Sequence, residues 1–117
     1  MNPQKIQFKS SELIEKSLGL RFNVPHKGEF ATGFVIRFEG KPYAYLNQCA
    51  HVSVELDWEH GRFFNVTQDF LICATHGAQY VPSSGVCVLG PCKGKRLQAI
   101  DVTEDNNEIT IHLESIQ

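Results

Sequence analysis

The feature that most limits the fold is a series of short runs in which apolar and polar residues alternate. In the segment 30–38, Phe34, Ile36 and Phe38 recur at every second position, and the segment 20–24 alternates in the same way. A period of two is typical of strands with one buried face. Because turn residues separate these runs, the sequence predicts an all-β fold, an antiparallel sandwich or small barrel.

The other predicted strands are equally short. They lie around residues 6–8 and at 42–46, 63–65, 70–73, 78–80, 97–102 and 108–113, with turns at 39–40, 83–85 and 105–107. A single short helix is predicted over residues 12–18. Ser10 and Ser11 would cap its amino end, and Gly19 would terminate it.

Size and charge exclude several classes of function. The chain has 117 residues, which suits one domain, and its 11 Lys+Arg against 13 Asp+Glu give a net charge of −2. This is not the basic surface of a nucleic-acid-binding protein. No apolar run approaches the roughly 20 residues of a membrane helix, and no secretory signal is evident. We therefore expect a cytoplasmic protein without membrane insertion.

Two short segments combine cysteine with histidine. Cys49 and His51 follow the strand predicted at 42–46, whereas Cys73 ends the strand predicted at 70–73 and His76 follows it. Two thiolates and two imidazoles suit either zinc or an iron–sulfur cluster. Zinc fingers usually place a cysteine pair in one segment and a histidine pair in the other. One of each per segment instead favours a binuclear [2Fe–2S] centre, with the thiolates on one iron and the imidazoles on the other.

The pattern Cys-x-His … Cys-x-x-His-Gly resembles the signature of the Rieske family. Segment 77–85 resembles the continuation of the second cluster loop, and Gly90-Pro91 resembles the proline loop that covers the cluster. The resemblance extends over about residues 43–102. It implies one [2Fe–2S] cluster per chain, with Cys49 and Cys73 on the buried iron and His51 and His76 on the outer iron.

The resemblance also implies a domain organisation. The whole chain, 1–117, would be a single Rieske domain of antiparallel β-structure. A sandwich or barrel base would come from about residues 4–46 and 96–115, and a small cluster-binding part from about 47–95.

Other positions near the expected cluster separate this chain from subtypes of the family. Rieske proteins of quinol-oxidising complexes have an extra cysteine in each cluster loop, where this chain has Val54 and Thr75, so their disulfide is excluded. Ala78 replaces their serine donor, but Tyr80 stands at their second donor, where dioxygenase ferredoxins usually have phenylalanine. The Tyr80 hydroxyl is expected to bond a cysteine sulfur. Gly77 and Pro91 complete the residues expected around the cluster.

The resemblance implies a soluble Rieske-type ferredoxin, which carries one electron at a time and is not itself an enzyme. Its partners would be a flavoprotein reductase and an oxygenase or other terminal redox enzyme. Electrons would leave through His51 and His76, within an apolar ring of Val52, Ala78, Leu89 and Pro91. Two alternatives remain open. In the first, the chain is an accessory small subunit of a larger oxidoreductase, such as nitrite reductase. In the second, it is a zinc-stabilised binding module.

The remaining cysteines, histidines and the single tryptophan receive simpler interpretations. Cys87 and Cys92 are interpreted as spare thiols, with a cross-link between them as the alternative. Trp58 is expected to pack beneath the first cluster loop. The other histidines are expected to be solvated: His26, His60 and His112.

Two charged runs flank the expected site. Glu55, Asp57 and Glu59 form an acidic run, and a basic run follows at 93–96. Both are interpreted as solvated surface or as sites that steer a redox partner. Their opposite signs leave the charge of that partner open.

Overall fold

The structure, a computed structural model, describes residues 5–28, 31–50, 54–57, 59–74, 77–90 and 93–116. Within these ranges the fold is built from nine strands in two antiparallel sheets, which confirms the all-β prediction. The helical segments of this part of the chain are single 3-10 turns: η1 (Ser10–Glu12), η2 (Pro25–Lys27) and η3 (Leu113–Ser115). None of the described helices is long and apolar enough to cross a membrane.

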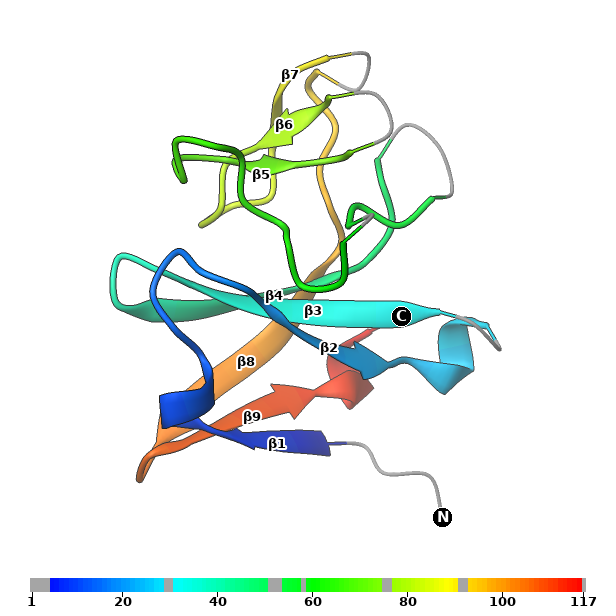
Figure 1. Cartoon of the computed structure of the whole chain (residues 1–117). Coiled ribbons are helices and arrows are strands. Elements are labelled where there is room, and N and C mark those ends of the chain that lie inside the picture. Colours follow the sequence, from blue (N-terminus) through cyan, green and yellow to red (C-terminus); the bar gives the residue numbers. More distant parts are fainter. Residues whose placement is uncertain are drawn as a thin grey trace.

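The larger sheet forms the lower part of the molecule in Figure 1. Its six strands follow the order β1-β9-β8-β4-β3-β2, and every neighbouring pair is antiparallel. They are β1 (Lys5–Lys9), β2 (Leu20–Asn23), β3 (Thr32–Phe38), β4 (Lys41–Leu46), β8 (Ala99–Asp105) and β9 (Glu108–His112).

This sheet curls into a barrel-like base. The rings of Phe8 in β1 and Phe22 in β2, the two edge strands, approach to 6.4 Å between centroids. Between the strands lies a core of buried aliphatic side chains that includes Val35, Ile109 and Ile111. Burial of this apolar surface is the main force that closes the base.

The smaller sheet lies above the base in Figure 1 and has the order β5-β6-β7. Its strands are β5 (Leu71–Ile72), β6 (Gln79–Tyr80) and β7 (Cys87–Leu89). Strands this short leave few backbone hydrogen bonds in the sheet. The small sheet therefore depends on the side chains that it packs against the base.

Strands β3 and β4 connect the two sheets because both of their faces are buried. Phe34 and Ile36 belong to the core under the small sheet, whereas Val35, between them, points into the barrel. The rings of Phe34 and Phe63 stack at 3.9 Å between centroids. Phe38 packs against the same core, so the predicted face of Phe34, Ile36 and Phe38 is confirmed.

The predicted helix over residues 12–18 is wrong. Only a 3-10 turn forms at its start, and the chain then runs beside the β3–β4 hairpin. The backbone N–H of Lys16 donates to the Arg37 carbonyl, and the Glu15 carboxylate accepts from the N–H groups of Glu39 and Gly40. These long-range bonds replace the local bonds that a helix would have made.

The other predicted strands are present with shifted ends, and two predictions need correction. The segment 63–65 is reduced to one bridge, between Phe64 and Leu71, and β8 begins at Ala99 instead of residue 97. Strand β7 was not predicted. The three predicted turns are confirmed, and in the last of them Asn106 and Asn107 adopt positive φ angles.

Tyr45 fastens the segment before β7 to the base. Its side chain is buried, and its hydroxyl donates to the Pro82 carbonyl at 2.7 Å. Gly85 lies against the same ring, because a Cβ at that position would come within 2.8 Å of Tyr45 Cε1. Burial raises the pKa of Tyr45 well above its ordinary value.

We predict that Tyr45→Phe lowers the free energy of unfolding at neutral pH by about 1–3 kcal/mol, because the Pro82 carbonyl loses its buried donor. The difference from the native chain should shrink above about pH 10. There the unfolded tyrosine ionises while the folded one stays protonated, so its contribution to stability falls as the pH rises. Urea unfolding at several pH values measures both effects. A difference that stays constant to high pH would contradict the second.

Candidate metal centre

The two predicted cysteine ligands lie at the ends of strands from different sheets. Cys49 follows β4 after two intervening residues, and Cys73 follows β5 directly. Both side chains are buried in one core with Tyr80 of β6 and with Ala78, which precedes that strand. The predicted ligands His51 and His76 lie outside the described residues, as does Pro91. The structure thus brings together the cysteine half of the predicted site.

The Tyr80 hydroxyl makes the contact that the sequence predicted. Its oxygen lies 3.1 Å from Cys49 Sγ and accepts the backbone N–H of Ala50 at 3.0 Å. Because the oxygen accepts one hydrogen bond, the hydroxyl proton remains available to the sulfur. A thiolate at Cys49 would therefore receive a buried donor.

The second loop is closed by two backbone hydrogen bonds on Cys73. Its N–H donates to the Ala78 carbonyl at 2.9 Å, and its carbonyl accepts from Gly77 N–H at 2.8 Å. Gly77 has a φ of +72°, a conformation that favours glycine. This geometry holds both ends of the segment that contains the predicted ligand His76.

The first loop is closed in a similar way and is joined to the second. The N–H of Cys49 donates to the Val54 carbonyl at 2.8 Å, so the backbone on the two sides of the segment 51–53 is bonded together. The N–H of Ala74 donates to the Leu56 carbonyl at 3.0 Å. The two loops are thus held by backbone geometry as one unit.

A buried carboxylate anchors the first loop to the base. The Asp57 side chain is 0% exposed and accepts from Asn47 Nδ2 at 3.0 Å and from Gly61 N–H at 2.9 Å. Asn47 Oδ1 in turn accepts the Leu56 N–H at 2.9 Å. Arg21 Nε lies 3.5 Å from Asp57 Oδ2 and supplies the opposite charge.

Glu55 extends this network to β2 and β3. Its carboxylate lies 2.6 Å from Arg21 Nη2 and accepts the Thr32 hydroxyl at 2.6 Å. Thr32 also accepts from Asn47 Nδ2 at 3.2 Å. We call Arg21, Thr32, Asn47, Glu55 and Asp57 the loop anchor.

Sequence reasoning missed most of the loop anchor. Glu55 and Asp57 were interpreted as solvated or steering groups, which is wrong for Asp57, and Asn47 and Arg21 were not singled out. The available signal was an acid between two bulky apolar residues, Leu56 and Trp58. Such a position indicates a buried carboxylate, which requires a partner.

The predicted apolar ring around the electron exit is corrected at one position. Ala78 is 0% exposed, so it belongs to the core and not to a surface ring. A Cβ at Gly90 would lie 2.9 Å from Ala78 Cα, which shows that the segment after β7 presses directly on this residue. Leu89 is 54% exposed. Val52 lies outside the described residues.

Of the other histidines, His60 is exposed as predicted, but His112 is not simply solvated. Its ring contacts the Thr103 hydroxyl at 3.0 Å and the Glu114 carboxylate at 3.3 Å. Cys87 is buried in the same core as Cys49, and its thiol donates to the Leu89 carbonyl at 3.3 Å.

Three further predictions fall on residues or side chains that the structure does not describe: Cys92, Trp58 and the side chain of His26.

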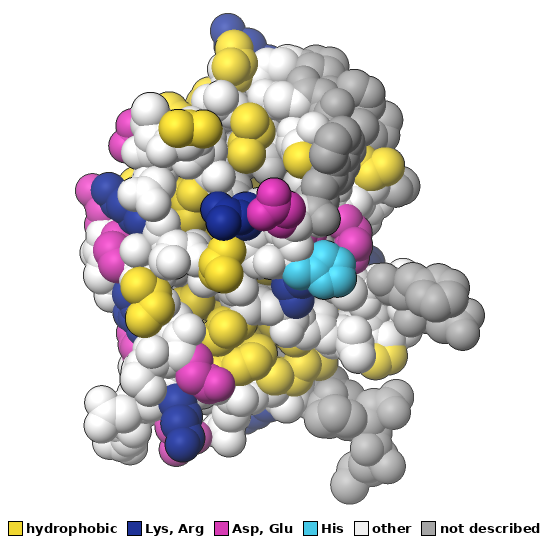
Figure 2. Space-filling model, in the orientation of Figure 1, with side chains coloured by type: hydrophobic (Ala, Val, Ile, Leu, Met, Phe, Trp, Pro, Cys, Tyr) yellow, Lys and Arg dark blue, Asp and Glu magenta, His cyan; other side chains and the backbone are white. Residues whose placement is uncertain are grey.

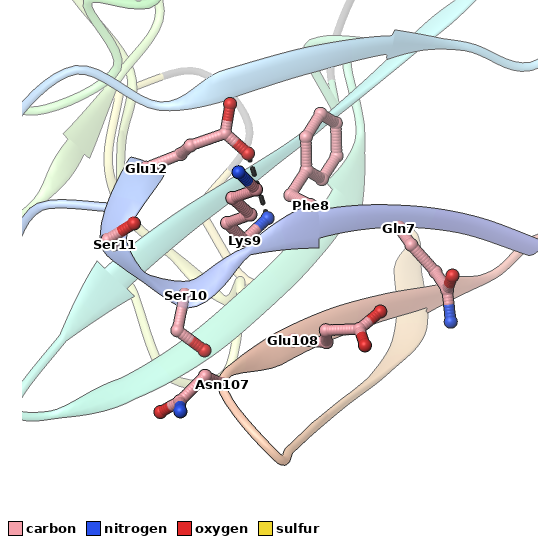
Figure 3. Close-up of a pocket in the computed structure, with 8 residues that line it drawn as sticks. All are labelled: Gln7, Phe8, Lys9, Ser10, Ser11, Glu12, Asn107 and Glu108. Carbon is pink, nitrogen blue, oxygen red and sulfur yellow. Dashed lines mark hydrogen bonds between the residues drawn. The ribbon is translucent and has the colours of Figure 1, made fainter.

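A groove of about 840 Å³ lies at the far end of the base (Figure 3). It is lined by the segment 7–12 together with Asn107 and Glu108. In Figure 1 these elements lie on the side of the barrel away from the small sheet. No predicted site residue lines it, so it does not belong to the candidate centre.

The described donor set fits the thiolate half of a [2Fe–2S] site. Two thiols lie in one buried core, at the ends of loops that backbone bonds hold together, and a phenol contacts one of the sulfurs. A buried thiolate is costly unless it binds a metal or accepts hydrogen bonds. Cys49 and Cys73 would meet that cost by holding iron, which would leave the outer positions to His51 and His76.

We predict that Asp57→Ala lowers the free energy of unfolding by about 2–5 kcal/mol, because it leaves two buried donors, Asn47 Nδ2 and Gly61 N–H, without this acceptor and removes one of the two carboxylates that face Arg21. Asp57→Asn keeps an oxygen acceptor and should lose less. Denaturant unfolding of both variants measures the difference. An alanine variant as stable as the native chain would show that the network is not an anchor.

Comparison with known proteins agrees with this geometry. Residues 9–109 match the Rieske [2Fe-2S] domain family. No relative with a curated description matches the chain.

Solved structures share the fold at low sequence identity. The ferredoxin of carbazole 1,9a-dioxygenase from Nocardioides aromaticivorans IC177 is 21% identical, with a TM-score of 0.70 over 93% of this chain and 97% of that chain. A chain in the complex of reduced oxygenase and oxidized ferredoxin of carbazole 1,9a-dioxygenase is 20% identical, with a TM-score of 0.74 over 95% and 94% of the two chains. In another oxygenase–ferredoxin complex of the same enzyme, the match covers 94% of this chain but 28% of the other, at 20% identity and a TM-score of 0.73. With the family match spanning most of its length and a fold that agrees, the chain belongs to the Rieske [2Fe–2S] domain family.

Proposed function

We propose that this protein is a one-electron carrier that holds one Rieske-type [2Fe–2S] cluster per chain. The observation that carries the proposal is the pair of buried thiols, Cys49 and Cys73, on two loops joined by backbone bonds. A cluster held by two thiolates and two imidazoles takes up one electron at roughly −150 to +300 mV.

Each functional residue has a distinct role in the proposal. Cys49 and Cys73 hold the inner iron, and His51 and His76 hold the outer iron. Gly77 allows the turn of the second loop, and Ala78 packs beneath the segment after β7. Tyr80 donates to the Cys49 sulfur, and Pro91 belongs to the segment that covers the cluster. We assign about residues 47–95 to the cluster-binding part and the rest of the single domain to its base.

The proposed partners are proteins. Several of the structures that share the fold are complexes of an oxygenase with a ferredoxin, in which a small protein of this kind meets a terminal enzyme. We propose that this chain receives electrons from a flavoprotein reductase and passes them to an oxygenase or another terminal redox enzyme, without transforming a substrate itself. The cytoplasm is the proposed location.

We predict that the anaerobically purified protein contains two irons per chain, absorbs visible light, and gives an EPR signal after reduction by one electron. Cys73→Ala should abolish the absorption and the signal. Cys87→Ala removes a thiol from the same buried core and should retain both. This pair separates ligation from general packing. A colourless, zinc-loaded native protein would contradict the proposal, and so would equal loss of iron in the two variants.

We predict that Tyr80→Phe lowers the midpoint potential, because the hydroxyl stabilises the more negative, reduced state through the Cys49 sulfur. A difference on the order of 1 kcal/mol between the two oxidation states corresponds to about 40 mV for one electron. Tyr45→Phe is the matched control, since that hydroxyl is bonded to the Pro82 carbonyl. Redox titration monitored by EPR measures both variants. An unchanged midpoint in Tyr80→Phe would show that the contact does not tune the centre.

A further inference from the structure

The acidic run beside the candidate centre is largely compensated by arginines within the protein. Glu55 and Asp57 both face Arg21, at 2.6 and 3.5 Å. Glu59 pairs with Arg62 at 2.6 Å. Three carboxylates against two arginines leave a charge of −1 around the first loop, so most of the field of the acidic run is cancelled there.

The basic run has no such compensation. Lys93, Lys95 and Arg96 are all exposed, and none of the ion pairs among the described residues includes them. Asp69 is a further carboxylate near the small sheet. It precedes β5, whereas Cys73 follows the opposite end of that strand, so Asp69 lies at the end of β5 away from the cysteine. The uncompensated charge that Lys93, Lys95 and Arg96 bring to the small sheet is thus positive.

Backbone hydrogen bonds place the basic run along β7. The N–H of Cys87 donates to the Lys95 carbonyl at 2.7 Å, and Val86 forms a bridge with Arg96. The N–H of Lys93 donates to the Gly90 carbonyl at 3.2 Å. Because Gly90 presses on Ala78, the basic run begins close to the core that holds the cysteines.

Apolar side chains are exposed on the same edge. Val88 is 38% exposed and Leu89 is 54% exposed, both in β7. At the top of Figure 2, above the small sheet, Lys/Arg and hydrophobic side chains lie together, and no acidic side chain is visible there. An apolar patch bordered by charge is typical of a small interface between redox partners. We call Val88, Leu89, Lys93, Lys95 and Arg96 the basic edge.

We propose that the basic edge is the docking surface for an acidic protein partner, and this inference rests on the proposed electron-carrier function. Like charges repel at long range, so the net charge of −2 would disfavour an acidic partner if the protein acted as a uniform charge. At physiological salt, however, the Debye length of about 8 Å makes the local charge decisive. The basic edge attracts the acidic partner, and Val88 and Leu89 supply the apolar contact.

Small redox reagents of opposite charge test the sign of this local field. The reduced, cluster-loaded protein is mixed with ferricyanide, a trianion that takes one electron from it and becomes ferrocyanide. We expect the second-order rate constant to fall about threefold or more between low and high salt, as for attraction to a positive surface. With the trication tris(phenanthroline)cobalt(III), which is also reduced by one electron, the rate constant should rise with salt.

Two triple variants locate the effect. Lys93→Gln, Lys95→Gln and Arg96→Gln together should remove the fall in rate with ferricyanide. Lys5→Gln, Lys9→Gln and Lys41→Gln together remove the same charge from exposed lysines of the base and should preserve it. Both variants carry three fewer positive charges, so an effect of net charge alone would change them equally. That equal change would overturn the proposal.

The remaining outcomes separate this inference from the function on which it rests. If the purified protein lacks the cluster, the reaction cannot be measured, and both the electron-carrier function and the docking proposal are overturned. A cluster-loaded native protein whose reaction with ferricyanide accelerates with salt overturns the basic edge alone. A third arm sediments the protein with vesicles of phosphatidylcholine and phosphatidylserine in equal parts. Binding that the basic-edge variant loses would assign the surface to a membrane and overturn the protein partner.

Discussion

The buried Asp57 carboxylate is the interaction on which the candidate centre depends. It lies in the first cluster loop, yet each of its oxygens is bonded outside its own residue, to Asn47 and to Gly61, with Arg21 opposite. A charge without exposure is tolerated only when such partners are complete. The partners of Asp57 stabilise its charge, and they also determine the path of the chain after Cys49, because the carboxylate must reach them. The loop is therefore oriented by the base and not by its own few residues.

Dependence on the base also explains how a small sheet of very short strands can support buried thiols. Its core is shared with the outer face of β3 and β4, whose inner face fills the barrel. Phe34 stacks on Phe63, and Tyr45 reaches the segment before β7. A site that must be dry and rigid is thus supported by strands whose register is already determined by the larger sheet.

Local patterns predicted the strands well because their alternation reflects a buried face that each strand carries in its own sequence. They failed where distant groups compete with local ones. Residues 12–18 have the composition of a helix, but bonds from Glu15 and Lys16 to the β3–β4 hairpin hold them in an irregular, non-helical path. Cys49 and Cys73 were predicted from motif spacing and Tyr80 from the resemblance to the Rieske family, and the structure joins Tyr80 to Cys49. The loop anchor escaped prediction because its members lie on four separate segments of the sequence.

Charge shows the same dependence on tertiary structure. From the sequence, an acidic run and a basic run of similar size flank the centre, and their opposite signs leave the charge of a partner open. In the folded chain Arg21 of β2 and Arg62 compensate two of the three negative charges, while the basic run lies exposed along β7. Composition counts both runs equally, but solvent and partners sense only the charges that the protein leaves uncompensated. A protein with a net charge of −2 can therefore present a positive surface next to the site where electrons would leave.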